Sequence, residues 1–121
     1  ATIRDDLVGY LIEARRAGRR VVGYGAPGKG NTLLNYCGIR PDLLAYTADR
    51  NPYKHGRFTP GVRIPVVPPE QLVADAPDEV LVLPWNLRDE ITAQLSQTLP
   101  AGTRLVFGLP SLETVTLGEA S

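Results

Sequence analysis

A glycine-rich turn is the first cluster of residues whose types and spacing suit an anionic ligand. Residues 23–28 read Gly-Tyr-Gly-Ala-Pro-Gly and match the spacing G-x-G-x-x-G. An apolar run precedes the turn, a helical pattern follows it, and Asp49 lies roughly 20 residues further on, as in dinucleotide-binding turns. Glycines let backbone N–H groups approach a phosphate, and a helix N-terminus carries a partial positive charge. We therefore expect ligand contacts at Gly25, Ala26 and Gly30, with a tight turn that binds nothing as the alternative.

The same stretch also matches a phosphate-binding P-loop in part. Gly23, Gly28 and Lys29 stand at the glycine and lysine positions, but Gly30 replaces the Ser or Thr that would bind Mg²⁺. Without that hydroxyl, and without an evident acid to hold the metal, nucleotide hydrolysis is not expected. What remains is that Lys29 directs a positive charge at a phosphate, or that it is a solvated lysine on a turn.

The loop from Asp49 to Gly61 is the second cluster. Over 13 residues it holds one histidine, two aromatic residues and three cations, which are Arg50, Lys54 and Arg57. Arginine binds phosphate with a planar fork of donors. The prolines and glycines indicate a fixed shape rather than a floppy linker. The alternative is a solvated surface loop.

Two residues of this loop have more than one interpretation. Asp49 either bonds a ribose hydroxyl, as in dinucleotide-binding domains, or pairs with Arg50 or Lys54 and shapes the loop. His55 is the only histidine, and an imidazole can serve as a general base. No carboxylate stands out as its partner, so a binding or surface role is favoured and no catalytic residue is predicted in this chain.

A third segment begins directly after an apolar run and reads Pro84-Trp85-Asn86. Trp85 either walls a ligand cleft or packs in the core. Asn86 either bonds the ligand or caps the next helix. Both pairs of alternatives stay open at this stage.

Apolar runs and helical spacings alternate along the chain. The expected helices span 1–18, about 31–37, 69–73 and 86–95. The expected strands span 20–25, 43–47, 64–66, 79–83 and 104–107. Pro65 places the third strand away from the centre of the sheet. The tail, 110–121, is small and polar and is predicted to be loosely ordered.

This alternation predicts one α/β domain over 1–121, a Rossmann-like three-layer sandwich whose mostly parallel sheet has helices on both faces. Ligands of such sheets bind beyond the carboxyl ends of the strands. The segments 25–30, 49–63 and 84–86 should therefore meet along one edge of the sheet, although they lie far apart in sequence.

Charge and composition restrict the partners. The chain has 13 basic and 13 acidic residues and a net charge of zero, which does not favour nucleic-acid or membrane binding. The basic residues gather between 29 and 63, which suggests one anionic ligand. Cys37 is the only cysteine, so neither an internal disulfide nor a cysteine metal cluster is expected. Nothing resembles a signal peptide or a membrane span, and a cytoplasmic protein is expected.

Three motifs taken together resemble a known family. They are Gly23-Tyr-Gly-Ala-Pro-Gly-Lys-Gly-Asn-Thr-Leu-Leu-Asn-Tyr36, Asp49-Arg-Asn-Pro-Tyr-Lys-His-Gly-Arg-Phe-Thr-Pro-Gly61 and Leu83-Pro-Trp-Asn-Leu-Arg-Asp-Glu90. In this order they resemble the C-terminal domain of sugar C-methyltransferases that depend on S-adenosylmethionine (SAM). The resemblance extends from Val21 to Leu109, nearly the whole chain.

That resemblance implies an enzyme that methylates a carbon of a deoxysugar carried by thymidine diphosphate (TDP), often in antibiotic biosynthesis. It implies a zinc-binding N-terminal domain and a central SAM-binding domain, both outside this chain, with no metal or cofactor in the fragment. Isolated, the fragment would be inactive, and its partners would be a TDP-sugar and the central domain. The resemblance places Lys29 and Asn31 near phosphate or sugar, Arg50, Lys54 and Arg57 near the diphosphate, and Trp85 with Asn86 at the cleft.

Two other functions fit the glycine turn. One is the NAD(P)-binding domain of an oxidoreductase, although 121 residues leave no room for a catalytic domain and Lys29-Gly30 is unusual at the start of a dinucleotide-binding helix. The other is a nucleotide-binding module without enzymatic activity.

Overall fold

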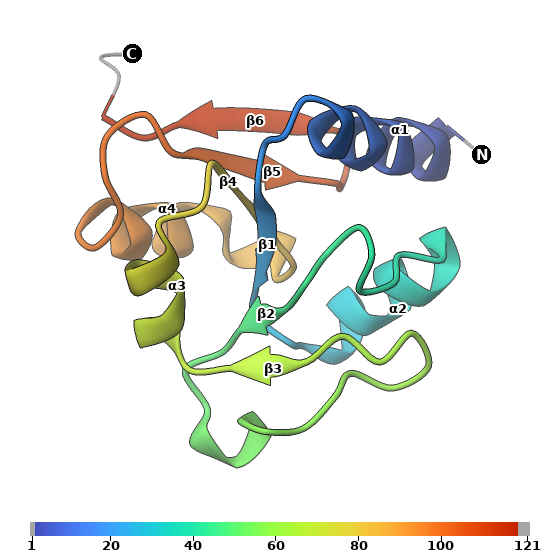
Figure 1. Cartoon of the computed structure of the whole chain (residues 1–121), viewed down its shortest axis with the longest axis horizontal. Helices are drawn as coiled ribbons and strands as arrows, with labels where there is room; N and C mark the ends of the chain where they lie inside the picture. Colours follow the sequence, from blue (N-terminus) through green and yellow to red (C-terminus); the bar gives the residue numbers. More distant parts are fainter. Residues whose placement is uncertain (1, 119–121) are drawn as a thin grey trace.

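Helices and strands alternate along the chain. The computed structural model describes residues 2–118, without the side chains at positions 2, 29 and 30. The helices are α1 (Thr2–Arg16), α2 (Gly28–Cys37), α3 (Pro69–Asp75) and α4 (Arg88–Ser96), with the short 3-10 helices η1 (Pro52–Lys54) and η2 (Trp85–Leu87). The strands are β1 (Val21–Tyr24), β2 (Thr47–Ala48), β3 (Val66–Val67), β4 (Glu79–Val82), β5 (Arg104–Phe107) and β6 (Glu113–Thr116) (Figure 1).

The strands form a sheet in the order β3-β2-β1-β4-β5-β6. The first five strands in this order, from β3 to β5 across the sheet, pair in parallel, and β6 is antiparallel to β5. β3 lies at the edge, as Pro65 predicted. The chain runs outward from β1 to β3 and then returns to β4 on the other side of β1. A sheet with this topology binds its ligand at the carboxyl ends of the two strands where the direction reverses, which are β1 and β4.

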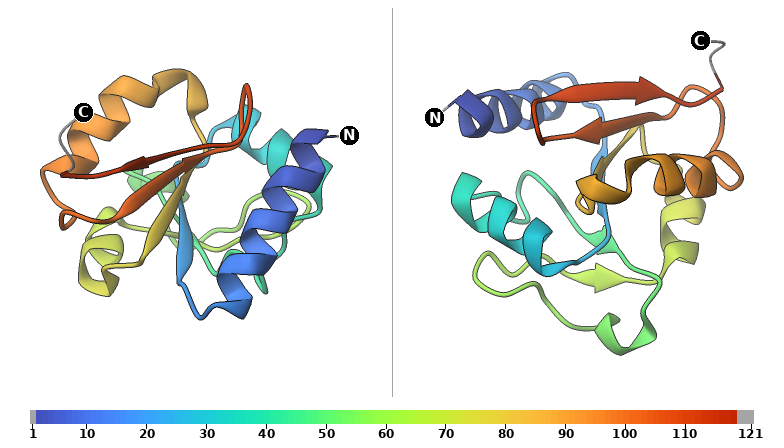
Figure 2. Two further views of the ribbon diagram at one scale, coloured as in Figure 1. Left: turned by 90° about the horizontal axis from the view of Figure 1, so that it is seen from above. Right: turned by 180° about the vertical axis from the view of Figure 1, so that it is seen from behind.

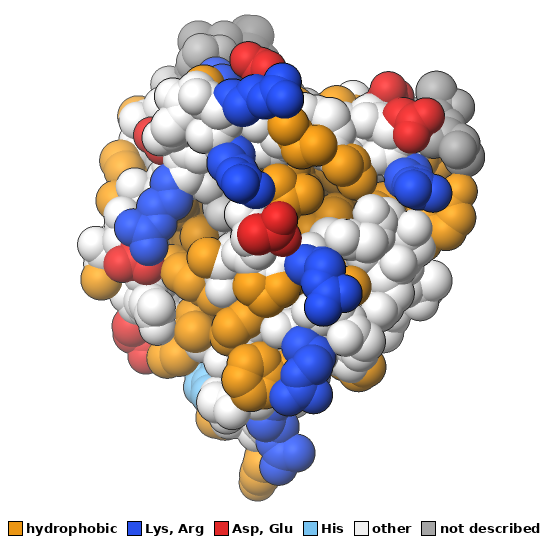
Figure 3. Space-filling view, turned by 45° about the vertical axis from the view of Figure 1, so that its right-hand side comes forward, with side chains coloured by type: hydrophobic (Ala, Val, Ile, Leu, Met, Phe, Trp, Pro, Cys, Tyr) orange, Lys and Arg blue, Asp and Glu red, His pale blue; other side chains and the backbone are white. Residues whose placement is uncertain are grey.

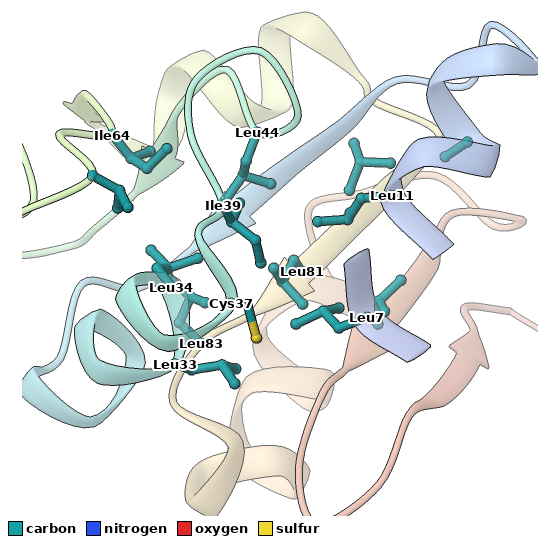
Figure 4. Close-up of a cluster of buried hydrophobic side chains, with 14 residues drawn as sticks. Leu7, Leu11, Leu33, Leu34, Cys37, Ile39, Leu44, Ile64, Leu81 and Leu83 are labelled. Atoms are coloured by element: carbon teal, nitrogen blue, oxygen red, sulfur yellow. The ribbon is translucent and has the colours of Figure 1, made fainter. Parts of the chain in front are cut away.

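Helices cover both faces of this sheet (Figure 2). α1 and α2 pack on one face through buried residues such as Leu7, Leu34 and Leu81, which point toward one another in Figure 4. α3 and α4 pack on the opposite face, where Leu72 and Val80 belong to a second buried cluster. Adjacent residues of β4 thus enter different cores, as its continuous apolar run predicted. The predicted fold class, a Rossmann-like three-layer sandwich, is confirmed.

Two strands differ from the predicted ranges. The backbone N–H groups of Leu43 and Leu44 donate to the Arg40 carbonyl at 3.0 and 3.1 Å, so this part of the 43–47 run forms a turn. Leu44 is fully buried. The apolar residues of this segment are therefore explained by packing in the core and not by a strand. Similarly, β3 is formed by Val66–Val67 and not by 64–66.

Two helices begin differently from the prediction. α2 begins at Gly28, and the Asn31 N–H donates to the Pro27 carbonyl at 3.0 Å, which places Asn31 inside the first turn. Asn86 lies in η2, and α4 starts after it without a side-chain cap. The interpretation of Asn86 as a helix cap is therefore wrong.

The predicted loose tail contains a strand. β6 pairs with β5 from Glu113 to Thr116, and Leu117 is buried against the α3–α4 side of the sheet. The polar composition of this segment reflects an edge strand, which needs few apolar residues because one side faces solvent. Residues 119–121 of the predicted tail, and residue 1 of the predicted leading helix, lie outside the described residues.

A buried carboxylate joins α1 to the amino edge of the sheet. The side chain of Glu79, at the start of β4, is 0% exposed and forms ion pairs with Arg19 at 2.9 Å and Arg104 at 3.2 Å. The Tyr10 hydroxyl also donates to it. Burial raises the pKa of Glu79 above its usual value, and the Arg104 guanidinium offsets this rise only in part.

We predict that Glu79→Gln alters the pH dependence of stability. A carboxyl whose pKa is raised in the folded protein adds stability below its usual pKa and loses it as the pH rises through the raised value. The free energy of unfolding of the wild type relative to Glu79→Gln should therefore fall as the pH rises above the usual glutamate pKa in urea titrations. Glu13→Gln, which removes an exposed carboxylate of α1, should show no trend. A flat difference for Glu79→Gln would contradict the assignment.

Candidate binding site at the carboxyl edge of the sheet

The glycine turn between β1 and α2 is held closely against the next two strands. Gly25 has φ +90°, and a Cβ there would lie 2.6 Å from Pro84 Cδ, so only glycine fits. Its N–H donates to the Ala48 carbonyl at 2.6 Å, and its carbonyl accepts from the Thr47 hydroxyl at 2.6 Å. The turn is therefore fixed in position before any ligand binds.

Asp49 fixes the other half of this turn. Its Oδ2 accepts from the Ala26 N–H at 2.7 Å, and its Oδ1 accepts from the Asn51 N–H at 2.8 Å. Lys54 Nζ donates to the Ala26 carbonyl at 2.9 Å and lies 3.9 Å from Asp49 Oδ2. The His55 ring bonds the Asp49 carbonyl. Of the two interpretations of Asp49, this arrangement is the one in which Asp49 pairs with Lys54 and shapes the loop.

These bonds also decide which backbone donors remain for a ligand. The N–H groups of Gly25 and Ala26, which we expected to face a phosphate, are both bonded within the protein. The next N–H groups belong to the first turn of α2, which contains Lys29 and Gly30. The Lys29 side chain lies outside the described residues, so its predicted role stays a prediction.

The basic loop has a fixed shape, as its composition predicted. The Gly56 N–H donates to the Val66 carbonyl at 3.0 Å, and the Val66 N–H donates to the Arg57 carbonyl at 2.8 Å, so the loop folds back on β3. Asn35 of α2 holds its tip through the Pro60 carbonyl at 3.0 Å and the Val62 N–H at 3.2 Å.

A pocket of about 150 Å³ lies between α2 and this loop; we call it the loop pocket. It is lined by Ala26, Asn31, Lys54, Arg57, Phe58, Thr59, Pro60 and Val66. Asn31, one of these lining residues, has its Oδ1 buried without a hydrogen-bond partner among the described residues. Arg57 is exposed and forms no ion pair with a carboxylate between residues 2 and 118. Figure 3 shows Lys and Arg side chains distributed from the top to the bottom of one face, with hydrophobic side chains between them.

A second concavity, of about 270 Å³, opens on the other side of the turn. Gly25, Asp49 and Arg50 line it, together with Tyr24 and residues of η2 and α4. Arg50 is exposed, and its charge counteracts the burial that raises the pKa of Tyr24. The sequence motifs did not single out Tyr24, although its place at the carboxyl end of an apolar strand was a usable signal.

The segment after β4 contributes residues other than those predicted. Pro84 and Leu87 line the second concavity. Trp85 is half-buried and Asn86 is exposed, and neither is among the residues that line the loop pocket or this concavity. Leu87 was missed because a leucine after Asn86 fits the apolar face of a helix equally well.

Three further observations concern metals, cysteine and membranes. Cys37 is buried in the core under α1 and α2, and burial raises the pKa of its thiol. Within residues 2–118, no group of histidine, cysteine, aspartate and glutamate side chains is arranged to hold a metal ion. No helix in that part of the chain has the length and apolar character needed to cross a membrane.

We predict that Asn35→Ala loosens the basic loop. Three hydrogen bonds of a solvent-exposed side chain are lost, two to the loop and one to the Asn31 carbonyl, so the free energy of unfolding should fall by about 1 kcal/mol in urea denaturation. The Val62 amide should also exchange its hydrogen faster. Asn86→Ala, which removes an exposed amide from η2, serves as the control and should change neither quantity. Unchanged Val62 exchange in Asn35→Ala would contradict the role of Asn35.

Comparisons with known proteins agree with the resemblance of the three motifs. The family model described as the C-methyltransferase C-terminal domain matches residues 1–110. The C-methyltransferase NovU of Streptomyces niveus is 36% identical over 110 residues, which cover 91% of this chain and 25% of that protein. The chain therefore spans about a quarter of the length of this relative.

Proposed function

Because the chain belongs to the family of C-methyltransferase C-terminal domains, we propose that it binds the nucleotide sugar in a longer, cytoplasmic enzyme. That enzyme would methylate a carbon of a TDP-linked keto-deoxysugar, as part of deoxysugar and antibiotic biosynthesis. The similarity to the C-methyltransferase NovU supports methyl transfer to carbon. That name specifies no substrate, and the nucleotide sugar is part of our proposal.

The observation that carries the proposal is the convergence of polar groups at the loop pocket. Asn31 Oδ1 is buried without a partner among the described residues, and a buried acceptor of this kind costs free energy unless a ligand donates to it. Arg57 borders the same pocket, and its guanidinium forms no ion pair with a carboxylate among residues 2–118. A sugar hydroxyl suits the first group, and a diphosphate suits the second.

Lys54 and Lys29 have supporting roles in this proposal. Lys54 shares the pocket but donates to the Ala26 carbonyl at 2.9 Å, so it contributes positive charge while it fixes the turn. Lys29 is the second residue of α2, where the partial positive charge of the helix N-terminus adds to the charge of the lysine. Together these groups would balance the charge of a diphosphate within a chain of zero net charge.

The chemistry requires that a carbon next to the sugar ketone loses a proton and then takes a methyl group. SAM supplies that methyl group when it is bound in a central domain outside this chain, and zinc belongs to an N-terminal domain. This chain contributes orientation only: holding the diphosphate at a distance fixes the position of the reacting carbon. Its partner domain would face the carboxyl edge, where the loop pocket opens.

An NAD(P)-binding domain is the alternative that the geometry disfavours. Asp49, which would have to bond a ribose, is occupied with the Ala26 and Asn51 N–H groups. The Gly25 N–H, which would approach a pyrophosphate, is bonded to the Ala48 carbonyl.

We predict that Arg57→Ala raises the dissociation constant for TDP about tenfold, because one charge-assisted contact to phosphate is lost. The constant is measured by NMR titration of the full chain, which detects weak binding. Since Arg57 is exposed, the melting temperature should not change. Lys54→Ala is a poorer probe because it also releases the turn.

Arg16→Ala is the matched control, since it removes an exposed arginine from the end of α1 without touching the loop pocket. Its affinity for TDP should equal that of the wild type. If both variants lose affinity for TDP equally, the effect comes from the net charge of the chain and not from a specific contact of Arg57. Tight NAD binding with no TDP binding would overturn the proposed function.

A further inference from the structure

A long groove runs from the carboxyl ends of β1 and β4 to the space between α3 and α4. It consists of the concavity of about 270 Å³ beside Gly25 and a neighbouring one of about 410 Å³. The two share Tyr24, Arg50 and Gln94, so they form one continuous surface, which we call the helical groove. Its inner end lies where the strand order reverses, the usual ligand position in such sheets.

Size separates this groove from the loop pocket. Sites for small organic ligands usually enclose about 300–1,000 Å³. The loop pocket, at about 150 Å³, is too small for a whole nucleotide sugar, whereas the larger part of the groove, at about 410 Å³, is large enough for a nucleoside. The turn at Gly25–Ala26 lies between them, since Gly25 borders the groove and Ala26 borders the loop pocket.

The walls of the groove suit a flat ring. Leu72 of α3 and Leu95 of α4 are buried at its base. Val73, at its outer side, leaves 44% of its surface exposed, and Leu87, at its inner side, leaves 42%. Apolar surface on two facing helices stabilises a ligand ring by removing it from water.

The carboxylates of Asp49, Glu70 and Glu90 and the amides of the groove suit the uncharged base and ribose of a nucleoside. Gln94 lies in both parts and Gln97 in the outer part, and a glutamine amide can pair with the N–H and carbonyl groups of a base. Glu90 lines the inner part, where a carboxylate accepts hydrogen bonds from ribose hydroxyls. Arg50, at the junction, is the one groove residue of positive charge, so it suits a phosphate at the end of the nucleoside.

From this geometry we infer that the helical groove binds the nucleoside half of the ligand. The base would lie between α3 and α4, the ribose near Tyr24 and Glu90, and the first phosphate at Arg50. The remaining phosphate and the sugar then cross the turn to the loop pocket. This inference rests on the proposed function, because it assigns the other half of the same nucleotide sugar.

The test compares TDP with inorganic diphosphate in NMR titrations of the full chain. Gln94→Leu should weaken TDP binding about tenfold, through loss of the amide contact, and should leave diphosphate binding unchanged. Gln71→Leu is the matched control, because Gln71 is an exposed residue of α3 that does not line the groove. Thymidine, which is uncharged, should shift the amides of Val73 and Gln94 in the wild type.

The outcomes separate the two proposals. If diphosphate binds but thymidine shifts no amide of the groove, and Gln94→Leu binds TDP as the wild type does, the groove assignment is overturned while the diphosphate site stands. If neither TDP nor diphosphate binds, the proposed function itself fails. If thymidine shifts only residues around the loop pocket, such as Phe58 and Thr59, the base lies there and the groove is excluded.

Discussion

The bond from the Ala26 N–H to the Asp49 carboxylate, 2.7 Å long, is the interaction on which the rest of the site depends. It ties the turn after β1 to the end of β2, and Lys54 reinforces it by donating to the Ala26 carbonyl. The same carboxylate also accepts a hydrogen bond from the Asn51 N–H. One side chain therefore fixes the backbone at the start of both the turn and the basic loop. A rigid edge of this kind positions ligand groups without a cost for ordering loops.

This constraint divides the carboxyl edge into two concavities. On one side, α2 and the loop enclose a small pocket lined by an exposed arginine and by Asn31, whose amide oxygen has no hydrogen-bond partner among the described residues. On the other side, α3 and α4 flank a larger groove with apolar walls. The Glu79 ion pairs lie at the amino edge, at the opposite end of the sheet from the proposed binding site. A ligand with a charged centre and two different ends fits this division.

The sequence was sufficient for the architecture and for the expectation that segments 25–30 and 49–63 lie at one edge of the sheet. The apolar run at 79–83 and the glycine turn predicted a buried parallel strand and a strand-to-helix turn, and both are confirmed. The strand at 43–47 was overpredicted, because Leu44 packs in the core from a turn and local patterns do not separate these cases. No sequence pattern marked Gln94 as a residue of the groove, because only the packing of α4 beside Tyr24 brings it to the edge of the sheet.

The most direct measurement is an NMR map of the backbone amides of the full chain during titration with inorganic diphosphate. Our account predicts that the shifts concentrate in the first turn of α2, around Asn31, and in the loop between Arg50 and Arg57. Shifts confined to the opposite edge, around Asp78 and Gly102, or no saturable shift at the turn, would contradict an anion site at the carboxyl edge of the sheet.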